Sequence, residues 1–222
     1  MDAQLLHERF EVQRQTMVDV QLRARGIRDE RVLAAMARVP RHEFIAREYY
    51  EQAYEDHPVP IGEGQTLSQP FIVAVMLEVL SLVGTETVLE VGTGSGYQTA
   101  LLAELCNWVY SIERHSSLAQ EAESTLRRLG YGNVAVRVGD GSRGVPEQAP
   151  FDAIIVSAAA PGIPQALLQQ MREGARMILP VGPLDAQELQ LVRKQQGRVT
   201  VLNLEGCRFV PLIGDQGYAE RG

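Results

Sequence analysis

The sequence has little of several features that mark common protein classes. It contains only two cysteines, Cys106 and Cys207, which lie far apart and have no C-x-x-C partner. A thiol metal site or redox motif is therefore disfavoured, and we expect both thiols to be buried in the core. No apolar run reaches the length of a membrane span, and the strongest, residues 71–83, is interrupted by Glu78. Because the polar, acidic start also differs from a signal peptide, we expect a cytoplasmic protein without membrane contact.

Basic charge is also scarce. The chain carries 21 Lys and Arg residues against 28 Asp and Glu residues, a formal net charge of −7. Phosphate binding needs a basic face, so this balance disfavours nucleic acid as a partner or substrate. With 45% hydrophobic residues the composition is that of a globular protein. A chain of 222 residues is long enough for one α/β domain with a substantial core.

Hydrophobic periodicity divides the chain into a helical start and an alternating remainder. Residues 4–56 have apolar positions at helical spacing, with Gly26 as a stop, Asp29 as the cap of the next helix, and Pro40 beyond its end. From residue 87 to 179 strands and helices alternate, as in a mostly parallel sheet with helices on both faces. The expected strands are 87–91, 108–113, 134–138, 151–157 and 175–179, and the expected helices are 97–105, 116–129, 163–172 and one that begins at Phe71. Residues 57–70 are expected to form a loop. Two further strands, 188–192 and 199–204, are expected to form an antiparallel pair near the end of the chain.

A glycine-rich turn follows the first of these strands. Glu90, Gly92, Gly94 and Gly96 form the pattern E-x-G-x-G-x-G. Glycines let the backbone turn sharply and approach a ligand closely, and the turn opens a helix whose first amide groups are free. A dinucleotide fingerprint would need a third glycine where Tyr97 stands. The pattern instead resembles motif I of the S-adenosylmethionine-dependent methyltransferases, and it implies their Rossmann-like class I fold.

An acidic residue ends the next strand in that family and binds the ribose hydroxyls. Here the strand ends at Glu113, whose carboxylate can accept two hydroxyl hydrogen bonds. The alternative is an ordinary α/β turn with an incidental surface glutamate. The cofactor contacts that the resemblance implies are Glu90, Gly92, Thr93, Gly94, Ser95, Gly96, Glu113, Arg114, Asp140 and Gly141.

A second glycine pattern, residues 139–144, matches G-x-G-x-x-G by letter. Pro146 and Pro150 follow, so no long helix can begin there, and no carboxylate stands at the spacing of a ribose contact. The dinucleotide interpretation therefore fails on context. In a methyltransferase, Asp140 and Gly141 would end the third strand beside the adenine ring. The alternative for Asp140 is a turn residue that binds its own backbone.

The segment Pro60–Pro70 makes the resemblance more specific. It closely resembles the P-I-G-x-G-Q-T-[IL]-S-x-P signature of the protein-L-isoaspartate O-methyltransferases. Further matching segments follow in the family's order and cover nearly the whole chain: 17–26, 40–44, 53–56, 151–156, 158–161, 179–182 and 208–212. Ser157 stands where Thr or Gly is common, and the tail after Gly214 has no assignment.

The resemblance implies a protein-repair enzyme. Such an enzyme transfers a methyl group from S-adenosyl-L-methionine to the free α-carboxylate of an L-isoaspartyl residue, leaving S-adenosyl-L-homocysteine. The ester then closes to a succinimide, which hydrolyses partly to aspartate. The expected partners are damaged, isoaspartyl-containing proteins and peptides, and we expect a monomer. The alternatives are an S-adenosylmethionine-dependent methyltransferase acting on another small molecule or on RNA, and a cofactor-binding adaptor without activity.

The chemistry of this reaction favours a neutral hydroxyl at the reacting group. The attacking carboxylate has a pKa near 4, so no general base is needed, and the four histidines form no evident catalytic set. Charge is neutralised during transfer, so a cationic clamp would stabilise the ground state. Ser68 is the expected catalytic residue, with Thr66 beside it. From its sequence position alone, Ser68 before Pro70 would be interpreted as a helix cap.

Other substrate contacts are expected from the same loop and from the C-terminal strands. Gln65 is either a loop-stabilising amide or a substrate contact. Val210, Pro211 and Leu212 are candidates for pairing with an extended peptide, and the alternative is an edge strand protected by proline. No metal site is expected. We expect one domain, 1–222, with N-terminal helices (1–57), an active-site loop (58–70), a cofactor-binding core (71–182) and C-terminal strands (183–222).

Overall fold

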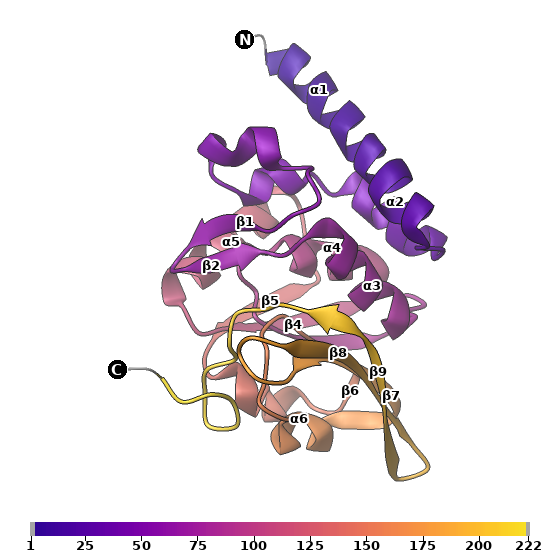
Figure 1. Ribbon diagram of the computed structural model, residues 1–222. Coiled ribbons are helices and arrows are strands. Elements are labelled where there is room, and N and C mark those ends of the chain that lie inside the picture. The colour runs from indigo at the N-terminus through magenta and orange to yellow at the C-terminus, as the bar shows by residue number, and fades with distance from the viewer. Residues whose placement is uncertain (1–2, 221–222) are drawn as a thin grey trace.

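The computed structural model describes residues 3–220. Seven strands form its main sheet: β3 (Thr87–Val91), β4 (Trp108–Glu113), β5 (Val134–Val138), β6 (Phe151–Val156), β7 (Met171–Val181), β8 (Gln187–Gln195) and β9 (Arg198–Cys207). Their order across the sheet is β5-β4-β3-β6-β7-β8-β9 (Figure 1). The first five strands in this order are parallel, and β8 and β9 are antiparallel. This architecture confirms the expected Rossmann-like class.

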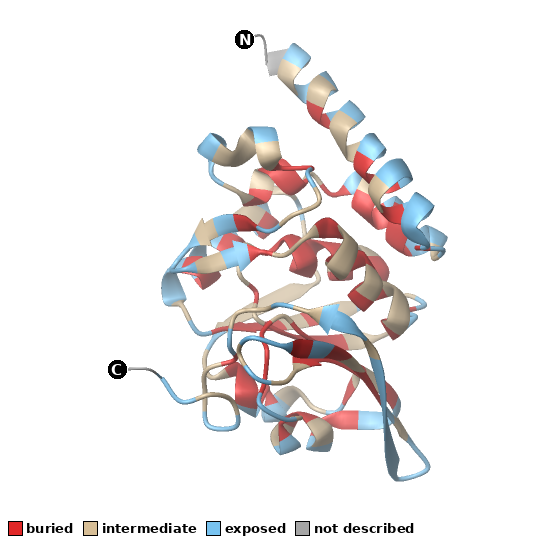
Figure 2. Cartoon of the chain, viewed as in Figure 1, coloured by how far each residue is buried: buried red, intermediate tan, exposed pale blue. Residues whose placement is uncertain are grey.

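Helices cover both faces of the sheet, as expected. The helices are α3 (Pro70–Leu80), α4 (Tyr97–Leu105), α5 (Ser116–Arg128) and α6 (Gln165–Gln169), and Figure 1 shows α3 and α4 on the face opposite α6. Successive residues of one strand belong to different hydrophobic clusters, Val88 to one and Leu89 to the other. This alternation follows from the two-residue period of a strand and explains why the central strands are buried on both faces (Figure 2).

The N-terminal part is helical and packs on the first of these clusters. It contains α1 (Ala3–Thr16) and α2 (Glu30–Arg38), a π-helical turn at Met17–Leu22, and 3-10 turns at Arg23–Arg25, Arg41–Phe44 and Arg47–Gln52. Gly26 has a left-handed φ of 110° and ends the first helical run. Asp29 caps α2 by accepting from Arg31 N at 2.8 Å and Val32 N at 3.4 Å. The predicted stop and cap are confirmed.

The structure corrects the expected elements at three places. The predicted loop 57–70 contains a hairpin, β1 (Val59–Gly62) and β2 (Gln65–Leu67), because Gly62 and Gly64 allow a tight turn at φ of 97° and 67°. The predicted helix 163–172 is reduced to α6. Strand β7 begins at Met171, earlier than predicted, because its pairing with β6 accommodates an irregularity between Phe151 and Ala153.

The two cysteines, both expected to be buried, differ in their burial. Cys106 is buried, whereas Cys207 is only partly buried, because it stands at the end of β9, the edge strand. In the described part of the chain, no helix combines the length and the apolar character that crossing a membrane requires.

Candidate active site

The carboxyl ends of β3 and β6 mark the point at which the chain reverses direction across the sheet. From β3 it proceeds through β4 to β5, and from β6 it proceeds the other way to β7. Ligands of open α/β sheets bind in the crevice at such a switch point. Here Gly92 N donates to Ile112 O and Ser157 N donates to Val91 O, each at 2.8 Å. A cavity opens beside these residues.

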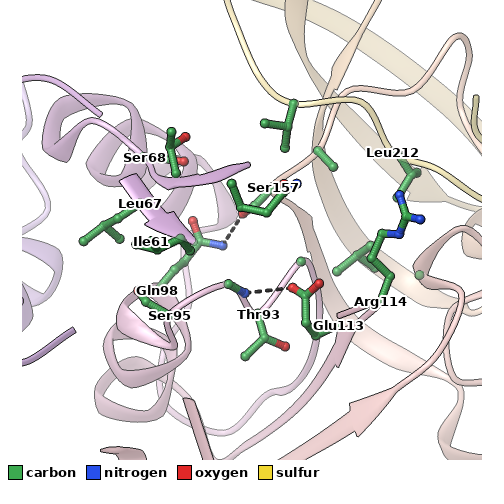
Figure 3. A pocket seen from close by; sticks show the side chains of 18 of the residues that line it. Ile61, Leu67, Ser68, Thr93, Ser95, Gln98, Glu113, Arg114, Ser157 and Leu212 are labelled. Carbon is green, nitrogen blue, oxygen red and sulfur yellow. Dashed lines mark hydrogen bonds between the residues drawn. The ribbon is translucent and has the colours of Figure 1, made fainter. Parts of the chain in front are cut away.

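Three segments that are distant in the sequence form the walls of this cavity (Figure 3): the turn 92–95, the hairpin with Ser68 after it, and the C-terminal segment 210–213. The sequence-predicted residues that line it are Gln65, Thr66, Ser68, Gly92, Thr93, Gly94, Ser95, Glu113, Arg114, Gly141, Val210, Pro211 and Leu212. Glu90, Gly96 and Asp140 do not line it.

The glycine turn has a left-handed backbone at all three glycines. The φ angles of Gly92, Gly94 and Gly96 are 92°, 54° and 90°. Gly94 lies under the hairpin, where a Cβ would be 3.2 Å from Ile61 Cδ1. Gly96 faces α5, where a Cβ would be 3.2 Å from Ala122 Cβ. Gly96 therefore serves helix packing, whereas Gly94 lets the backbone reach the cavity.

Glu113 and Ser95 provide polar groups next to this turn. The carboxylate of Glu113 is buried, and it accepts from Gly94 N at 2.9 Å and from His115 N at 3.0 Å. Each oxygen keeps a lone pair for a further donor. Ser95 Oγ is buried and has no hydrogen-bond partner within residues 3–220. A buried hydroxyl without a partner is costly, so a ligand atom fits beside it.

Glu90 is behind the cavity rather than in its wall. Its side chain is fully buried, and its carboxylate accepts hydrogen bonds from Gln98 Nε2, Thr99 Oγ1 and Ser111 Oγ at 3.1, 2.5 and 2.6 Å. Burial raises the pKa of Glu90 to about 7, against the opposite effect of these three donors. Its first task is therefore to join β3 to α4 and β4.

Asp140 binds backbone, as the alternative interpretation of this residue holds. Its Oδ1 accepts from Ser142 N at 2.9 Å, and its Oδ2 accepts from Asp215 N at 2.8 Å. The second bond attaches the C-terminal tail to the end of β5. An ion pair between Arg114 and Glu220 continues this contact. The tail without an assignment is thus held against Asp140, next to Gly141 in the cavity wall.

A buried cation holds Ser68 in place. Arg41 is fully buried, and its Nη2 donates to Ser68 O while its Nε donates to Ala53 O, both at 2.8 Å. Burial lowers the pKa of Arg41 to about 10, so it stays charged at neutral pH. Within residues 3–220 the hydroxyl of Ser68 has no hydrogen bond, and it faces the cavity.

Asp56, and not Ser68, caps α3. Asp56 Oδ1 accepts from Phe71 N at 3.2 Å, in the first turn of the helix. Asp56 Oδ2 accepts from Gln69 Nε2 at 2.7 Å. The capping interpretation of Ser68 is therefore wrong, and its hydroxyl is available for other chemistry.

A second groove joins the first cavity at four residues, Thr66, Ser68, Ser157 and Val210. It runs along the C-terminal strands, with Gln187, Arg208 and Phe209 among its lining residues. Val210 O accepts from Ala159 N and Leu212 N donates to Ala159 O, each at 2.8 Å. The segment 210–212 is thus fixed to Ala159. All three residues line the first cavity, and Val210 lines the groove as well.

The hairpin lies across the glycine turn and is fastened at its tip. Ser117 Oγ donates to Glu63 Oε1 at 2.7 Å, and His115 Nδ1 is 3.7 Å from Glu63 Oε2. Gln65 Nε2 donates to Glu63 O at 3.0 Å, as a loop-stabilising amide would. Gln65 also lines the cavity, as a substrate contact would, so both interpretations of this residue stay open.

Arg41, Asp56, Gln98 and Ser157 complete the site and were not singled out from the sequence as site residues. Arg41 binds Ala53 and Ser68, Asp56 binds Phe71, and Gln98 binds Ser157. These partners are 12 to 59 positions apart in the chain. The only sequence signal was indirect: Arg41 and Asp56 belong to family-like segments, and Ser157 departs from the residues common at its position.

The cavity fits S-adenosyl-L-methionine. Glu113 offers carboxylate oxygens for two ribose hydroxyls, and Ser95 offers an unpaired buried hydroxyl. Gly141 and Ile112 give an apolar wall, where a Cβ on Gly141 would lie 2.5 Å from Val91 Cγ1. The described residues contain no cluster that could hold a metal ion.

Comparison with known proteins points to one family. A family model described as protein-L-isoaspartate(D-aspartate) O-methyltransferase matches residues 12–217. The protein-L-isoaspartate O-methyltransferase of Koribacter versatilis (strain Ellin345) is 56% identical over 210 residues, which cover 95% of either chain. That of Syntrophus aciditrophicus (strain SB) is 54% identical over 215 residues, 96% of this chain and 99% of the relative.

Solved structures agree. A protein-L-isoaspartate O-methyltransferase superposes with a TM-score of 0.83 at 30% identity, over 92% of this chain and 67% of its own. A Plasmodium falciparum protein described as the same enzyme was solved in complex with S-adenosyl-L-homocysteine. It has a TM-score of 0.79 at 26% identity, over 90% of this chain and 98% of its own.

Proposed function

The chain belongs to the protein-L-isoaspartate O-methyltransferase family, and from this premise we propose how its own residues divide the work. The protein transfers a methyl group from S-adenosyl-L-methionine to the free α-carboxylate of L-isoaspartyl residues in damaged proteins and peptides. The observation that carries the assignment of roles is the meeting of two cavities at Ser68. One has the carboxylate and glycine turn that suit the cofactor, and the other is open along the C-terminal strands.

The first cavity holds the cofactor. Glu113 accepts hydrogen bonds from the ribose hydroxyls with the lone pairs that Gly94 and His115 leave free. The turn at Gly92 and Gly94 permits close backbone approach, and Ser95 gains a partner for its buried hydroxyl. When bound, the cofactor supplies a methyl group on a positively charged sulfur.

Ser68 orients the substrate carboxylate at the junction of the cavities. The carboxylate is already ionised at neutral pH, so no base has to remove a proton. A neutral hydroxyl donor holds it without neutralising the charge that attacks, and alignment of the reacting atoms lowers the barrier. Arg41 supports this from the far side, because its charge is directed at the backbone carbonyl of Ser68 and not at the substrate.

The second groove receives the peptide that carries the isoaspartyl residue. Thr66 and Val210 line both cavities, and Pro211 and Leu212 line the first, so they stand where the peptide meets the reacting group. Recognition through backbone groups of an extended peptide suits a repair enzyme, because damaged sites differ in their neighbouring side chains.

We further propose a monomer that acts in the cytoplasm as one domain, residues 1–222. One hydrophobic cluster includes residues of the N-terminal helices, the cofactor-binding core and the C-terminal strands, such as Met36, Val88 and Leu191. The net charge of −7 accords with a protein that binds neither nucleic acid nor an anionic membrane.

The test uses two synthetic peptides that are identical except for one Asp or isoAsp linkage, each incubated with S-adenosyl-L-methionine labelled in its methyl group. Base-labile label in the isoAsp peptide alone is the expected result. Label in neither peptide, with cofactor binding intact, would support the alternative, a methyltransferase acting on another small molecule or on RNA.

A further inference from the structure

Two chains of hydrogen bonds lead from the cavity wall to Glu90. One runs from Thr93 through Ser111 Oγ, which is 2.6 Å from both Thr93 Oγ1 and Glu90 Oε2. The other starts at Ser157, because Gln98 Nε2 donates both to Ser157 Oγ at 2.7 Å and to Glu90 Oε1 at 3.1 Å. Glu90 itself is fully buried and touches neither cavity.

Glu90 fixes the direction of the second of these chains. Its Oε1 accepts from Gln98 Nε2, so both amide protons of Gln98 are used, one on Glu90 and the other on Ser157. Ser157 therefore accepts from Gln98, and its own hydroxyl proton is free to donate elsewhere. Were the amide of Gln98 reversed, its oxygen would accept that proton instead. Glu90 thus decides, through Gln98, which way the hydroxyl of Ser157 points.

Ser157 stands at the centre of the site. It follows the last residue of β6 at the switch point, and a Cβ on Gly92 would be 3.5 Å from its own Cβ. It lines both the cofactor cavity and the peptide groove, as Ser68 does. Figure 3 shows Gln98 extending toward Ser157, with a dashed line for the hydrogen bond between them.

We propose that Ser157 is a second hydroxyl donor to the isoaspartyl α-carboxylate, and that Gln98 and Glu90 are positioning residues that act through it. This inference rests on the proposed function. The carboxylate has two oxygens, and donors from Ser68 and Ser157 fix its plane as well as its position. One oxygen lone pair then attacks the methyl carbon: the O–C bond forms, the S–C bond breaks, and its electron pair stays on sulfur. No proton moves, so Ser157 keeps its proton throughout.

The first test compares the wild type with Ser157→Ala and Ser157→Thr on an isoaspartyl peptide. Removal of one hydrogen bond to a charged group should lower kcat/KM by roughly tenfold or more. Threonine keeps the hydroxyl and should restore most of the activity. Calorimetry with S-adenosyl-L-homocysteine should give equal affinities for all three proteins, because Ser157 serves the substrate. A loss of cofactor affinity as large as the loss of kcat/KM would overturn the proposal, as would a fully active Ser157→Ala.

The second test reverses the hydrogen bonds that run from Glu90 through Gln98 to Ser157. In Glu90→Gln an amide N–H₂ can face Gln98, which must then present its oxygen and take the proton of Ser157. Its activity should fall as in Ser157→Ala, and the double variant should be no slower than Ser157→Ala alone, since both changes remove the same interaction. Losses that multiply would overturn the positioning roles.

If Glu90→Gln fails to fold, Gln98→Met measured alone and together with Ser157→Ala gives the same comparison of single and double variants without changing the buried carboxylate. The wild type in the same assay separates the two levels of inference. A wild type that does not methylate the isoaspartyl peptide contradicts the proposed function. An active wild type beside an equally active Ser157→Ala contradicts this inference alone.

Discussion

The guanidinium of Arg41 donates to the backbone carbonyl oxygens of Ser68 and Ala53, both at 2.8 Å. Arg41 is fully buried, and within the described residues no carboxylate forms an ion pair with it. Its charge is stabilised by carbonyl dipoles, and its side chain determines the position of the loop that carries the catalytic hydroxyl. This relationship and the site geometry lead to five predictions.

Arg41→Met should loosen the segment around Ser68. The change leaves the carbonyl oxygens of Ala53 and Ser68 without their donor, which costs roughly 1–3 kcal/mol for each buried group left unpaired. Urea unfolding should show this loss of stability, and kcat on an isoaspartyl peptide should fall. Arg47→Met is the matched control, because Arg47 is exposed. A kcat equal to that of the wild type would show that Ser68 is held by other contacts.

Ser68→Ala should lower kcat by roughly tenfold while the affinity for S-adenosyl-L-homocysteine stays the same. Asp56 and not Ser68 caps α3, so the free energy of unfolding should change by less than about 0.5 kcal/mol. Steady-state kinetics, calorimetry and urea unfolding check the three statements. Equal losses of turnover and cofactor affinity would assign Ser68 to the cofactor.

Glu113→Gln should weaken cofactor binding first. Its carboxylate accepts from two backbone amides, and the amide group of glutamine would present donors to Gly94 or to the ribose hydroxyls. We expect the Kd for S-adenosyl-L-homocysteine to rise by roughly tenfold or more. Glu121→Gln, an exposed position on α5, should leave the Kd unchanged. Unchanged affinity in Glu113→Gln would show that the ribose binds elsewhere.

Stability should fall as the pH rises through the titration of Glu90. Burial raises the pKa of this carboxyl from 4.5 to about 7, with a further small increase from the charge of Glu113. The folded state therefore binds a proton more tightly than the unfolded state between these values. The contribution is fully present below about pH 4.5 and is lost by about pH 7, a change on the order of 3 kcal/mol. Urea unfolding across this range should show it.

Glu90→Gln cannot titrate at this position, so the decline in stability between these two pH values should be smaller than in the wild type. Parallel pH profiles for the two proteins would show that Glu90 has an ordinary pKa in the folded state.

Gly214→Ala should detach the C-terminal tail. A Cβ at this position would collide with the carboxylate of Asp140 and with Ser142 Oγ. The tail is bound to Asp140, whose neighbour Gly141 lines the cofactor cavity, so the Kd for S-adenosyl-L-homocysteine should rise. Gly162→Ala is the control, because a Cβ there would meet no atom within 4 Å. An equal Kd in both variants would show that the tail does not contribute to cofactor binding.

The sequence predicted the core of the fold to the residue in several places. The ends of β3, β4, β5 and α4 agree with the predicted ranges, because each strand is an apolar run between polar or glycine-rich turns. Parallel pairing then brings the ends of β3 and β4 together. Gly92, Gly94 and Glu113, which the resemblance assigns to the cofactor, accordingly line one cavity.

The remaining parts of the site depend on contacts that no local pattern contains. The hairpin β1–β2 has strands of only four and three residues, interrupted by proline and glycine. Arg41 looks like any surface arginine, because its partners are backbone carbonyls. Gln98 and Ser157 are 59 positions apart, and only the pairing of β3 with β6 brings them together.

The cluster around Glu90 also constrains how this protein can evolve. Its three donors, Gln98, Thr99 and Ser111, come from α4 and β4, and each leaves an unmatched polar group behind if it changes alone. Neutral drift at these positions should therefore be coupled. We expect homologous lineages that lose the hydroxyl at position 111 to have lost the carboxylate at position 90 as well, so that the four residues are inherited together as a block.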